Sequence, residues 1–218
     1  MRVSEVFVSI QGEGDSVGRV CLFIRVQGCP LDCIWCDTKY SVSFKGGKEI
    51  SRQKLSRVIG NFLKKTQGTV VFTGGEPLFY QREISELLEE VKLESVEFET
   101  SGIYLPMESL RDYKFNVSPK LSSAQLSGGS KVYERIYSNL SYFAQINSIF
   151  KFVVSDSNEL EEVLSLVEKY DLPKSRVYIM PQGMTEKEIV ERARFIIPFC
   201  IESGLNFSPR LQVLLGIR

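Results

Sequence analysis

The sequence predicts a mixed α/β fold: a partial, open β/α barrel formed by a single domain that spans residues 1–218. Strand-like segments alternate with amphipathic helical segments along most of the chain, which implies that the strands pair in parallel. About six strand–helix units can be recognised, fewer than the eight of a closed barrel. In addition, 218 residues are enough for one domain with a sizeable hydrophobic core.

The predicted strands are short and rich in apolar residues. Residues 2–10 alternate between apolar and polar side chains, whereas residues 20–26 (VCLFIRV) are almost continuously apolar, as expected for a strand covered on both faces. The predicted strands cover residues 2–10, 20–26, 69–73, 96–100, 113–117, 149–154 and 176–180.

Helical segments lie between these strands. Residues 51–65 place apolar side chains on one helix face, and residues 84–91 do so over a shorter length. Thr185 and Glu188 have the spacing of a capping box. The predicted capping residues are Ser51 for the first of these helices, Asp156 or Ser157 for a helix over residues 158–170, and Thr185 for a long helix toward Gly204.

The remaining segments carry few strand or helix signals. Residues 41–47 and 121–130 are polar and rich in glycine and serine, so we read them as loops, either lids or plain surface loops. Active sites in α/β folds lie at the C-terminal ends of the strands, and we expect the site of this chain there.

The overall charge is balanced, with 27 Lys plus Arg and 27 Asp plus Glu. This balance argues against direct nucleic-acid binding, which usually shows as a basic excess, and it means that an anionic ligand must be met by a local cation. No apolar run approaches the roughly 20 residues of a membrane span, and the N-terminal segment lacks the apolar core of a signal peptide. We therefore expect a cytoplasmic protein with no membrane contact.

Three of the five cysteines, Cys29, Cys33 and Cys36, follow a C-x3-C-x2-C pattern. A structural zinc site needs four ligands, yet the chain has no histidine, and Cys21 and Cys200 are isolated and expected to be packed thiols. A disulfide is rare in the cytoplasm, and a redox dithiol leaves the third cysteine unexplained. A 4Fe–4S cluster on three thiolates, with its fourth iron open to another ligand, fits best. Without histidine, proton transfer near neutral pH would use carboxylates, lysine, cysteine or water.

This spacing, with Trp35 before the last cysteine, resembles the radical S-adenosylmethionine superfamily. A second motif, TGGEP at residues 73–77, follows a predicted strand. Glycine there allows the backbone to approach a ligand closely, and the acidic residue can accept hydrogen bonds from an ammonium group, although the segment alone could be a simple turn. The resemblance implies that S-adenosylmethionine chelates the open iron and yields a 5′-deoxyadenosyl radical, which abstracts a hydrogen atom.

The chain resembles one family of that superfamily, the 7-carboxy-7-deazaguanine synthases, from residue 3 onward, with residues 40–68 and 121–148 uninformative. The resemblance implies a lyase of queuosine and 7-deazapurine biosynthesis that converts 6-carboxy-5,6,7,8-tetrahydropterin to 7-carboxy-7-deazaguanine with loss of ammonia. It also implies Mg²⁺, a flavodoxin- or ferredoxin-type electron donor and a homodimer. The segments that carry it are residues 9–14 (SIQGEG), 23–29 (FIRVQGC), 35–38 (WCDT), 73–77 (TGGEP), 99–102 (ETSG), 117–120 (VSPK) and 180–183 (MPQG).

The resemblance also implies roles for individual residues. Arg25 would bind the substrate carboxylate through its guanidinium group, with a structural salt bridge as the alternative. Thr38 would give its hydroxyl to Mg²⁺, with Asp37 as the chemical rival. The remaining substrate-binding residues would be Ile10, Gln11, Gly12, Glu13 and Thr73, where residues 10–13 could instead form an exposed polar turn.

The cofactor site would be completed at later strand ends. Lys120 could instead be a solvated lysine at the end of a strand. The residues implied to bind S-adenosylmethionine are Trp35, Gly75, Glu76, Ser118, Pro119, Lys120, Met180, Pro181, Gln182 and Gly183.

The C-terminal segment departs from the family pattern. Relatives commonly have a histidine where this chain has Gln212, and glutamine can donate a hydrogen bond to the substrate carboxylate but cannot carry a proton. We expect Gln212 to bind substrate and Arg218 to close the pocket, with a frayed terminus as the alternative for Arg218.

Two other functions remain open. A glycyl-radical activase shares the cysteine spacing and the GGE segment but docks a large protein partner, whereas SIQGEG and FETSG favour a small pterin. A non-catalytic iron–sulfur or zinc scaffold would not cleave S-adenosylmethionine when reduced.

Overall fold

The computed structural model describes residues 1–217 and contains a nine-stranded sheet in the order β3-β1-β2-β4-β5-β6-β7-β8-β9. β1 is antiparallel to β2 and β3, and every neighbouring pair from β2 to β9 is parallel. The strands are β1 Arg2–Ile10, β2 Val20–Val26, β3 Lys48–Glu49, β4 Thr69–Gly74, β5 Val96–Thr100, β6 Lys114–Val117, β7 Ser148–Val154, β8 Val177–Pro181 and β9 Asn206–Phe207.

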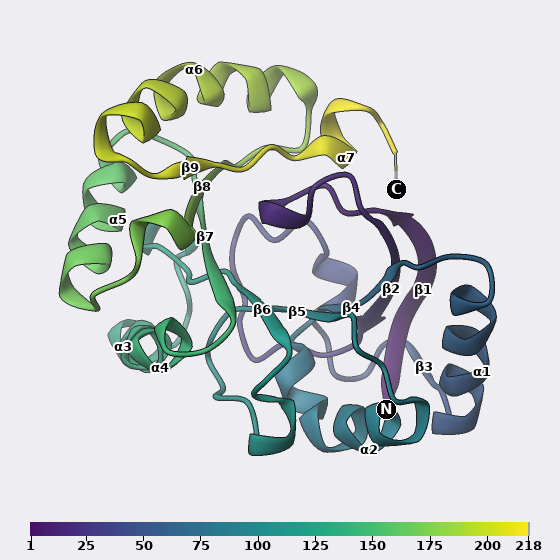
Figure 1. The fold of residues 1–218 in the computed structure, drawn as a ribbon. Helices are drawn as coiled ribbons and strands as arrows, with labels where there is room; N and C mark the ends of the chain where they lie inside the picture. Colours follow the sequence, from purple (N-terminus) through teal and green to yellow (C-terminus); the bar gives the residue numbers. More distant parts are fainter. Residues whose placement is uncertain (218) are drawn as a thin grey trace.

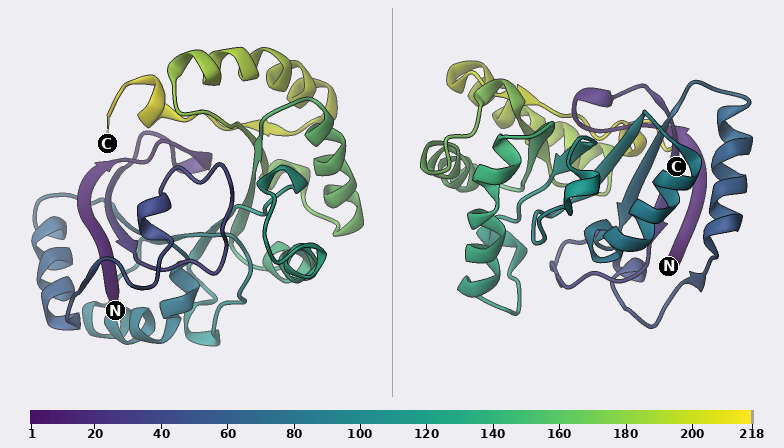
Figure 2. Two further views of the ribbon diagram at one scale, coloured as in Figure 1. Left: turned by 180° about the vertical axis from the view of Figure 1, so that it is seen from behind. Right: turned by 60° about the horizontal axis from the view of Figure 1, so that its bottom comes forward.

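The sheet curves into an open barrel, and the helices lie around its outside (Figure 1; Figure 2). β3 and β9 are the two edges of the sheet, which confirms the predicted partial barrel. The helices are α1 Arg52–Leu63, α2 Gln81–Val91, α3 Ser130–Ser138, α4 Leu140–Ala144, α5 Asn158–Lys169, α6 Glu186–Ser203 and α7 Leu211–Leu214. Short 3-10 turns are η1 Gly14–Ser16, η2 Lys39–Ser41, η3 Pro77–Tyr80, η4 Glu108–Leu110, η5 Ser122–Ala124 and η6 Lys174–Arg176.

Local sequence signals placed most of these elements correctly. Every predicted strand is present, with ends that differ by at most one residue. Ser51 caps α1 by accepting a hydrogen bond from the Lys54 amide (3.3 Å), and Thr185 forms the predicted capping box with Glu188 at the start of α6. At α5 the cap is Ser157, whose side chain makes no capping bond. The sequence did not indicate α3, α4, α7, β3 or β9.

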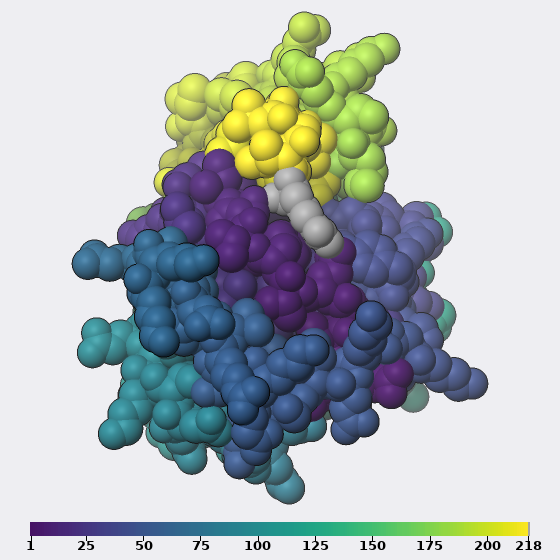
Figure 3. Space-filling model, turned by 90° about the vertical axis from the view of Figure 1, so that its right-hand side faces the viewer, coloured from purple at the N-terminus to yellow at the C-terminus, as the bar shows by residue number. Residues whose placement is uncertain are grey.

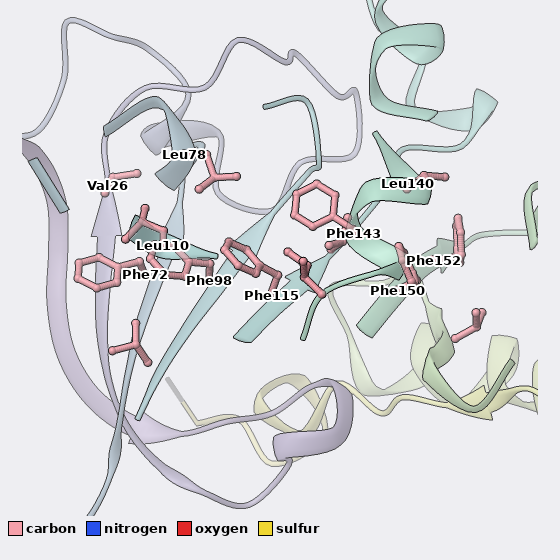
Figure 4. Packing of buried hydrophobic residues seen from close by; sticks show 14 of the residues in the cluster. Val26, Phe72, Leu78, Phe98, Leu110, Phe115, Leu140, Phe143, Phe150 and Phe152 are labelled. Atoms are coloured by element: carbon pink, nitrogen blue, oxygen red, sulfur yellow. The ribbon is translucent and has the colours of Figure 1, made fainter. Parts of the chain in front are cut away.

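The core lies between the sheet and the helices. Successive residues of a strand face opposite sides, so alternate side chains of β4 to β7 point outward and are fully buried. Phe72, Phe98 and Phe115 stack in a row across three strands, with ring centroids 5.4 and 5.1 Å apart (Figure 4). Phe150 and Phe152 of β7 extend this layer. The other set of alternate residues faces the barrel interior and includes polar and charged side chains.

The C-terminal segment packs against the segment that follows β1. The Leu211 amide donates a hydrogen bond to the Gly12 carbonyl (3.0 Å), and the Gly14 amide donates one to the Ser208 hydroxyl (2.8 Å). In Figure 3 the yellow C-terminal residues lie directly on the purple N-terminal ones. Residues far apart in sequence therefore close one side of the open barrel. Among residues 1–217, no helix is long and apolar enough to cross a membrane.

Candidate active site

A cavity of about 250 Å³ lies inside the barrel, at the C-terminal ends of the parallel strands. This is the predicted location of the site. The cavity is lined by most of the predicted residues: Ile10, Gln11, Gly12, Glu13, Arg25, Cys29, Cys33, Trp35, Cys36, Thr38, Thr73, Gly75, Ser118, Lys120, Met180, Gln182 and Gln212. Glu76, Pro119, Pro181 and Gly183 are not part of its lining, and Arg218 lies outside the described residues.

The three clustered cysteines reach the cavity from an irregular loop between β2 and η2. The Leu31 amide donates a hydrogen bond to the Cys29 sulfur (3.4 Å), and the Cys36 amide donates one to the Cys33 carbonyl (3.2 Å). Burial raises the pKa of the Cys29 thiol to about 12, and burial likewise raises that of Cys33. Metal binding would favour the thiolate form of both.

The cysteine arrangement fits a 4Fe–4S cluster better than a single metal ion. Within residues 1–217, no group of three His, Cys, Asp or Glu side chains converges closely enough to hold one ion. A four-iron cluster does not need such convergence, because each thiolate binds its own iron. Cys29, Cys33 and Cys36 share one cavity, so they can hold three corners of a cluster. Cys21 and Cys200 are buried, as expected for packed thiols.

The segment before and within α3 covers the cysteine loop from one side. Leu126 and Ile136 form a buried apolar group with Leu31 and Cys33. The Ile34 amide donates a hydrogen bond to the Ala124 carbonyl (3.1 Å). We call residues 121–138 the collar. The predicted loop at residues 121–130 is thus a packed cover of the cysteines.

Gly75 lies where the end of β4 touches the start of the cysteine loop. A Cβ atom at this position would come within 2.1 Å of the Gly28 carbonyl oxygen. The Glu76 amide also donates a hydrogen bond to that oxygen (2.9 Å). Glycine is therefore required at residue 75 for the two backbone segments to meet at the cavity.

Glu76 is fully buried and is not part of the cavity lining. Its carboxylate accepts hydrogen bonds from the Thr100 hydroxyl (2.7 Å) and from both the hydroxyl (2.6 Å) and the amide (2.9 Å) of Ser101. It also caps η3 by accepting from the Leu78 amide (3.1 Å). In this structure Glu76 joins the ends of β4 and β5, whereas Thr73, Gly74 and Gly75 of the motif line the cavity.

Lys120 and Trp35 lie together in the cavity wall. The Lys120 ammonium lies 5.6 Å from the centroid of the Trp35 ring and donates a hydrogen bond to the Ser118 hydroxyl (3.0 Å). Among residues 1–217, Lys120 is the one cavity cation without a salt bridge. A ligand carboxylate beside the cysteines would therefore meet an uncommitted cation.

At the end of β8, Met180 and Gln182 line the cavity. The Gln182 amide donates a hydrogen bond to the Val154 carbonyl (2.8 Å), and the Gly183 carbonyl accepts one from Arg210. Pro119, Pro181 and Gly183 thus shape the backbone around the cavity and do not line it.

Glu99 organises the polar side of the cavity. Its carboxylate accepts hydrogen bonds from the Gln11 amide group (3.0 Å) and from the Thr73 hydroxyl (2.6 Å). These contacts connect the segment after β1 with β4 and β5. Gln11 is only 2% exposed, so the predicted SIQGEG segment is not an exposed turn.

Glu13 accepts hydrogen bonds from three side chains. Its Oε1 atom accepts from Arg210 Nε (3.2 Å) and Gln212 Nε2 (2.6 Å), and its Oε2 atom accepts from Lys151 Nζ. Arg210 also pairs with Asp37, beside the cysteine loop. Burial alone would raise the pKa of Glu13, but Lys151, Arg210 and the hydrogen bonds outweigh it and lower the pKa to about 2. The carboxylate is therefore ionised at neutral pH.

Arg25 projects inward from β2, between the two sides of the cavity. Its Nε atom donates to Glu5 (3.1 Å), and its guanidinium lies 5.9 Å from the centroid of the Phe7 ring. The alternative weighed above, a structural salt bridge, is therefore present. Because Arg25 also lines the cavity, its predicted contact with a substrate carboxylate stays a prediction.

Three buried polar atoms in the cavity lining have no hydrogen-bond partner within the described part of the chain. They are Trp35 Nε1, Asn116 Oδ1 and Gln212 Oε1. Buried polar atoms in folded proteins nearly always have partners, and such atoms in a cavity wall are typical of a site that binds a polar ligand.

Several polar residues of this site were missed as site residues, among them Glu99, Asn116, Lys151 and Arg210. Lys151 carried a usable signal, because it is a charged residue inside an otherwise apolar strand, the same pattern that singled out Arg25. Glu99 shares its short strand with Glu97, so its charge did not stand out. Asn116 lies inside β6 and shows no comparable signal. Arg210 lies in a short segment whose partners, Glu13 and Asp37, are about 170 to 200 residues away, and no local pattern reveals such contacts.

Comparison with known proteins defines the class. Residues 10–106, which include the three clustered cysteines, match a family described as a 4Fe-4S single cluster domain. The fold is shared with SuiB from Streptococcus suis, solved bound to S-adenosylmethionine, at a TM-score of 0.62 and 14% identity over 84% of this chain and 48% of that one. The cysteine loop, the cluster domain and the open barrel are those of a radical S-adenosylmethionine enzyme with a 4Fe–4S cluster.

More similar proteins narrow this class to a family. The 7-carboxy-7-deazaguanine synthase of Pyrobaculum aerophilum is 39% identical, over 98% of this chain and 94% of the relative. The crystal structure of QueE from Escherichia coli matches at a TM-score of 0.68 and 26% identity, over 96% of this chain and 93% of that one. The chain belongs to the 7-carboxy-7-deazaguanine synthase family, which confirms the predicted resemblance.

Proposed function

We propose that the chain converts 6-carboxy-5,6,7,8-tetrahydropterin to 7-carboxy-7-deazaguanine with loss of ammonia, a lyase reaction of queuosine and 7-deazapurine biosynthesis. The observation that carries the proposal is the shared cavity, in which the three cysteines face a polar wall that contains Glu13, Arg25 and Glu99. Relatives named for this product support it. A docking site for a large protein would not need a cavity with such a polar wall, and neither would a passive cluster scaffold.

On the cysteine side, Cys29, Cys33 and Cys36 would hold the 4Fe–4S cluster. When bound there, the cluster and S-adenosylmethionine supply a 5′-deoxyadenosyl radical that removes a hydrogen atom from the substrate. Lys120, which makes no salt bridge within residues 1–217, would bind the methionine carboxylate. Gly75 has no side chain, so it would leave room for S-adenosylmethionine in the cavity.

On the opposite side, the polar wall would bind the pterin. The pterin has neighbouring N–H donors on its pyrimidine edge, and a carboxylate can accept two such bonds at once. Glu13 and Glu99 both line the cavity, and hydrogen bonds from neighbouring side chains hold their carboxylates in place. Arg25 would bind the carboxylate group of the substrate, at the other end of the molecule.

Thr38 is the better of the two candidate ligands for Mg²⁺. The carboxylate of its rival Asp37 is paired with Arg210. The Thr38 hydroxyl lies in the cavity lining, 3.7 Å from the Cys36 sulfur. Mg²⁺ keeps several water ligands, so one protein hydroxyl together with substrate oxygens is sufficient.

The proposal includes a flavodoxin- or ferredoxin-type electron donor, because the cluster must be reduced. It also includes a homodimer, as is common in the family, and a cytoplasmic location, where thiols stay reduced and can bind iron.

The test is anaerobic reconstitution with iron and sulfide, followed by turnover of 6-carboxy-5,6,7,8-tetrahydropterin with S-adenosylmethionine, a reductant, and either Mg²⁺ or EDTA. We expect formation of 7-carboxy-7-deazaguanine, with a faster rate in Mg²⁺. Replacement of Cys29, Cys33 and Cys36 by alanine should abolish the brown cluster absorption, S-adenosylmethionine cleavage and product formation together.

Cys200→Ala is the matched control, because Cys200 is a buried thiol of α6 that does not line the cavity. This variant should retain cluster and turnover. A reconstituted protein that cleaves S-adenosylmethionine but forms no product from the pterin would contradict the proposed substrate.

A further inference from the structure

Lys151 is a buried cation that none of the assigned roles uses. It projects inward from the middle of β7, and its side chain is 6% exposed. Its ammonium contacts Oε2 of Glu13, which follows β1, and it lines the cavity. Lysine is almost never buried this completely without a reason in pairing or function.

The charged groups in and around this pair come from five parts of the fold. Lys151 faces Glu13 and, from β5, Glu99, whose negative charge also acts on it. Glu13 faces Lys151 from β7 and Arg210 from the segment before α7, and Arg210 in turn faces Asp37. Two cations therefore bracket one carboxylate, and the Gln212 amide completes its set of donors.

Stability alone does not account for this arrangement. A buried ion pair loses hydration on both partners, and an apolar pair of similar volume is often equally stable. The pair is instead useful to a binding site, because a carboxylate fixed from several directions presents a constant shape and charge to a ligand.

We infer that Lys151 is a positioning residue for substrate binding, which holds Glu13 in one orientation and in its anionic form toward the N–H edge of the pterin. This inference rests on the proposed function. It assigns Lys151 no contact with the substrate and no proton transfer. Arg210 acts from the other side, and Lys151 is the partner that can be changed without disturbing Asp37 and the cysteine loop.

Loss of Lys151 should also change the pH dependence of substrate binding. Burial raises the pKa of Glu13, and the positive charge of Lys151 is the largest effect that lowers it. Without Lys151, Glu13 would take up a proton at a higher pH, although Arg210 still opposes this. A protonated Glu13 loses an acceptor for the pterin, so the apparent affinity for substrate should fall as the pH decreases.

The experiment uses Lys151→Met, which keeps the length of the side chain and removes its charge. We expect the substrate KM to rise about 10- to 100-fold, the value of a lost charged hydrogen bond. The rise should be larger toward pH 5 than at pH 8. Substrate-independent cleavage of S-adenosylmethionine and the cluster absorption spectrum should stay as in the wild type, and Lys151→Arg should restore most of the affinity.

Lys114→Met is the matched control. Lys114 is also an inward-facing lysine, in the neighbouring strand β6, but it pairs with Asp15 and Glu97 and does not line the cavity. The Lys114→Met variant should have the same substrate KM as the wild type, with the same pH dependence. An equal rise of KM in this variant would show that any lost inner-face charge has the same effect and would overturn the inference.

The double variant Glu13→Gln/Lys151→Met keeps the test valid if Lys151→Met alone folds poorly, because it leaves no unpaired buried charge at this pair. With Glu13 neutralised, loss of Lys151 should add little to the KM of Glu13→Gln, since the two residues act as a unit. If the effects of the two substitutions on KM add, or if Lys151→Met has the wild-type KM at every pH, the inference is rejected. Turnover of the pterin by the wild-type protein would still support the proposed function in that case. Absence of turnover by the wild type would reject both.

Discussion

At the scale of single residues, Gln212 is the residue that distinguishes this site from the family pattern. It makes a hydrogen bond of 2.6 Å to Glu13 through its amide nitrogen, and its amide oxygen is buried without a partner among residues 1–217. That oxygen packs over Gly12, where a Cβ atom would be only 2.0 Å away. The glutamine therefore combines a fixed donor with an acceptor that remains for a ligand.

Gln212→Leu tests this role, because leucine has a similar size and neither polar group. We expect the substrate KM to rise about 5- to 20-fold, since one hydrogen bond to Glu13 and one to the ligand are lost. The kcat for S-adenosylmethionine cleavage without substrate should be unchanged. Gln212→Glu places a second carboxylate beside Glu13 and should raise KM further. Steady-state kinetics with equal KM for all three proteins would contradict a role for Gln212 in binding.

The individual residues also show which parts of the site could be predicted from the sequence. Cysteine spacing and the short motifs at strand ends found the residues that contact the cavity from loops, because these signals are local. Glu99 and Lys151 acquire their partners only when β5 and β7 curve toward the segment after β1, so a charge inside a strand could mark Lys151 as unusual but could not show what it binds. The Glu76 carboxylate is held by Thr100 and Ser101 of the next strand end, and no local pattern predicts these contacts.

At the scale of secondary-structure elements, the collar is the part of the fold that sequence analysis described least well. The glycines and serines of residues 121–130 indicated a loop, and α3 and α4 follow directly without a capping signal. The N-cap of α3 is Gly129, which has no side chain, and the Asn139 side chain makes no capping bond to α4. Strands and capped helices were predictable because period and cap are local properties. The collar is ordered by its contacts with the cysteine loop, including the hydrogen bond from the Ser127 amide to Asp32 (3.1 Å).

We expect the collar to protect the cluster from oxygen. Leu126 is 5% exposed and packs in the same apolar group as Cys33. Leu126→Ser should admit water to the cluster, because solvent exposure is one of the factors that tune Fe–S centres. We expect cluster absorption to bleach in air at least several-fold faster than in the wild type and the midpoint potential to shift.

Leu63→Ser, at an exposed leucine on α1, is the control and should bleach at the wild-type rate. The measurements are the decay of visible absorption after exposure to air and a redox titration. Equal bleaching in both variants would show that the collar does not shield the cluster.

At the scale of the whole molecule, the ion pairs around Glu13 connect β7, the segment after β1 and the C-terminal segment. The pKa of Glu13 is about 2 in the folded protein, compared with the ordinary value of 4.5. Because the folded pKa is the lower one, the stabilisation is fully present above about pH 4.5 and is lost as the pH falls toward 2.

The apoprotein should therefore lose on the order of 2 kcal/mol of folding free energy between pH 5 and pH 3 through Glu13 alone. In the variant Glu13→Gln/Lys151→Met, neither residue 13 nor residue 151 titrates. Between pH 5 and pH 3, the melting temperature of this variant should therefore fall by several degrees less than that of the wild type. Circular dichroism melts at both pH values measure the difference. The same fall in both proteins would mean that Glu13 is not held as an anion by its neighbours.

The contacts that complete the site also determine when it can exist during synthesis. The cysteines, Gly75 and Lys120 are all made within the first 120 residues, whereas the donors to Glu13 are residues 151, 210 and 212. A nascent chain on the ribosome can therefore assemble the half that would hold the cluster well before the half that would bind the pterin. Iron loaded at that stage would lie beside an open, water-filled barrel, so the cell gains by delivering iron and sulfide only after the last strands have closed.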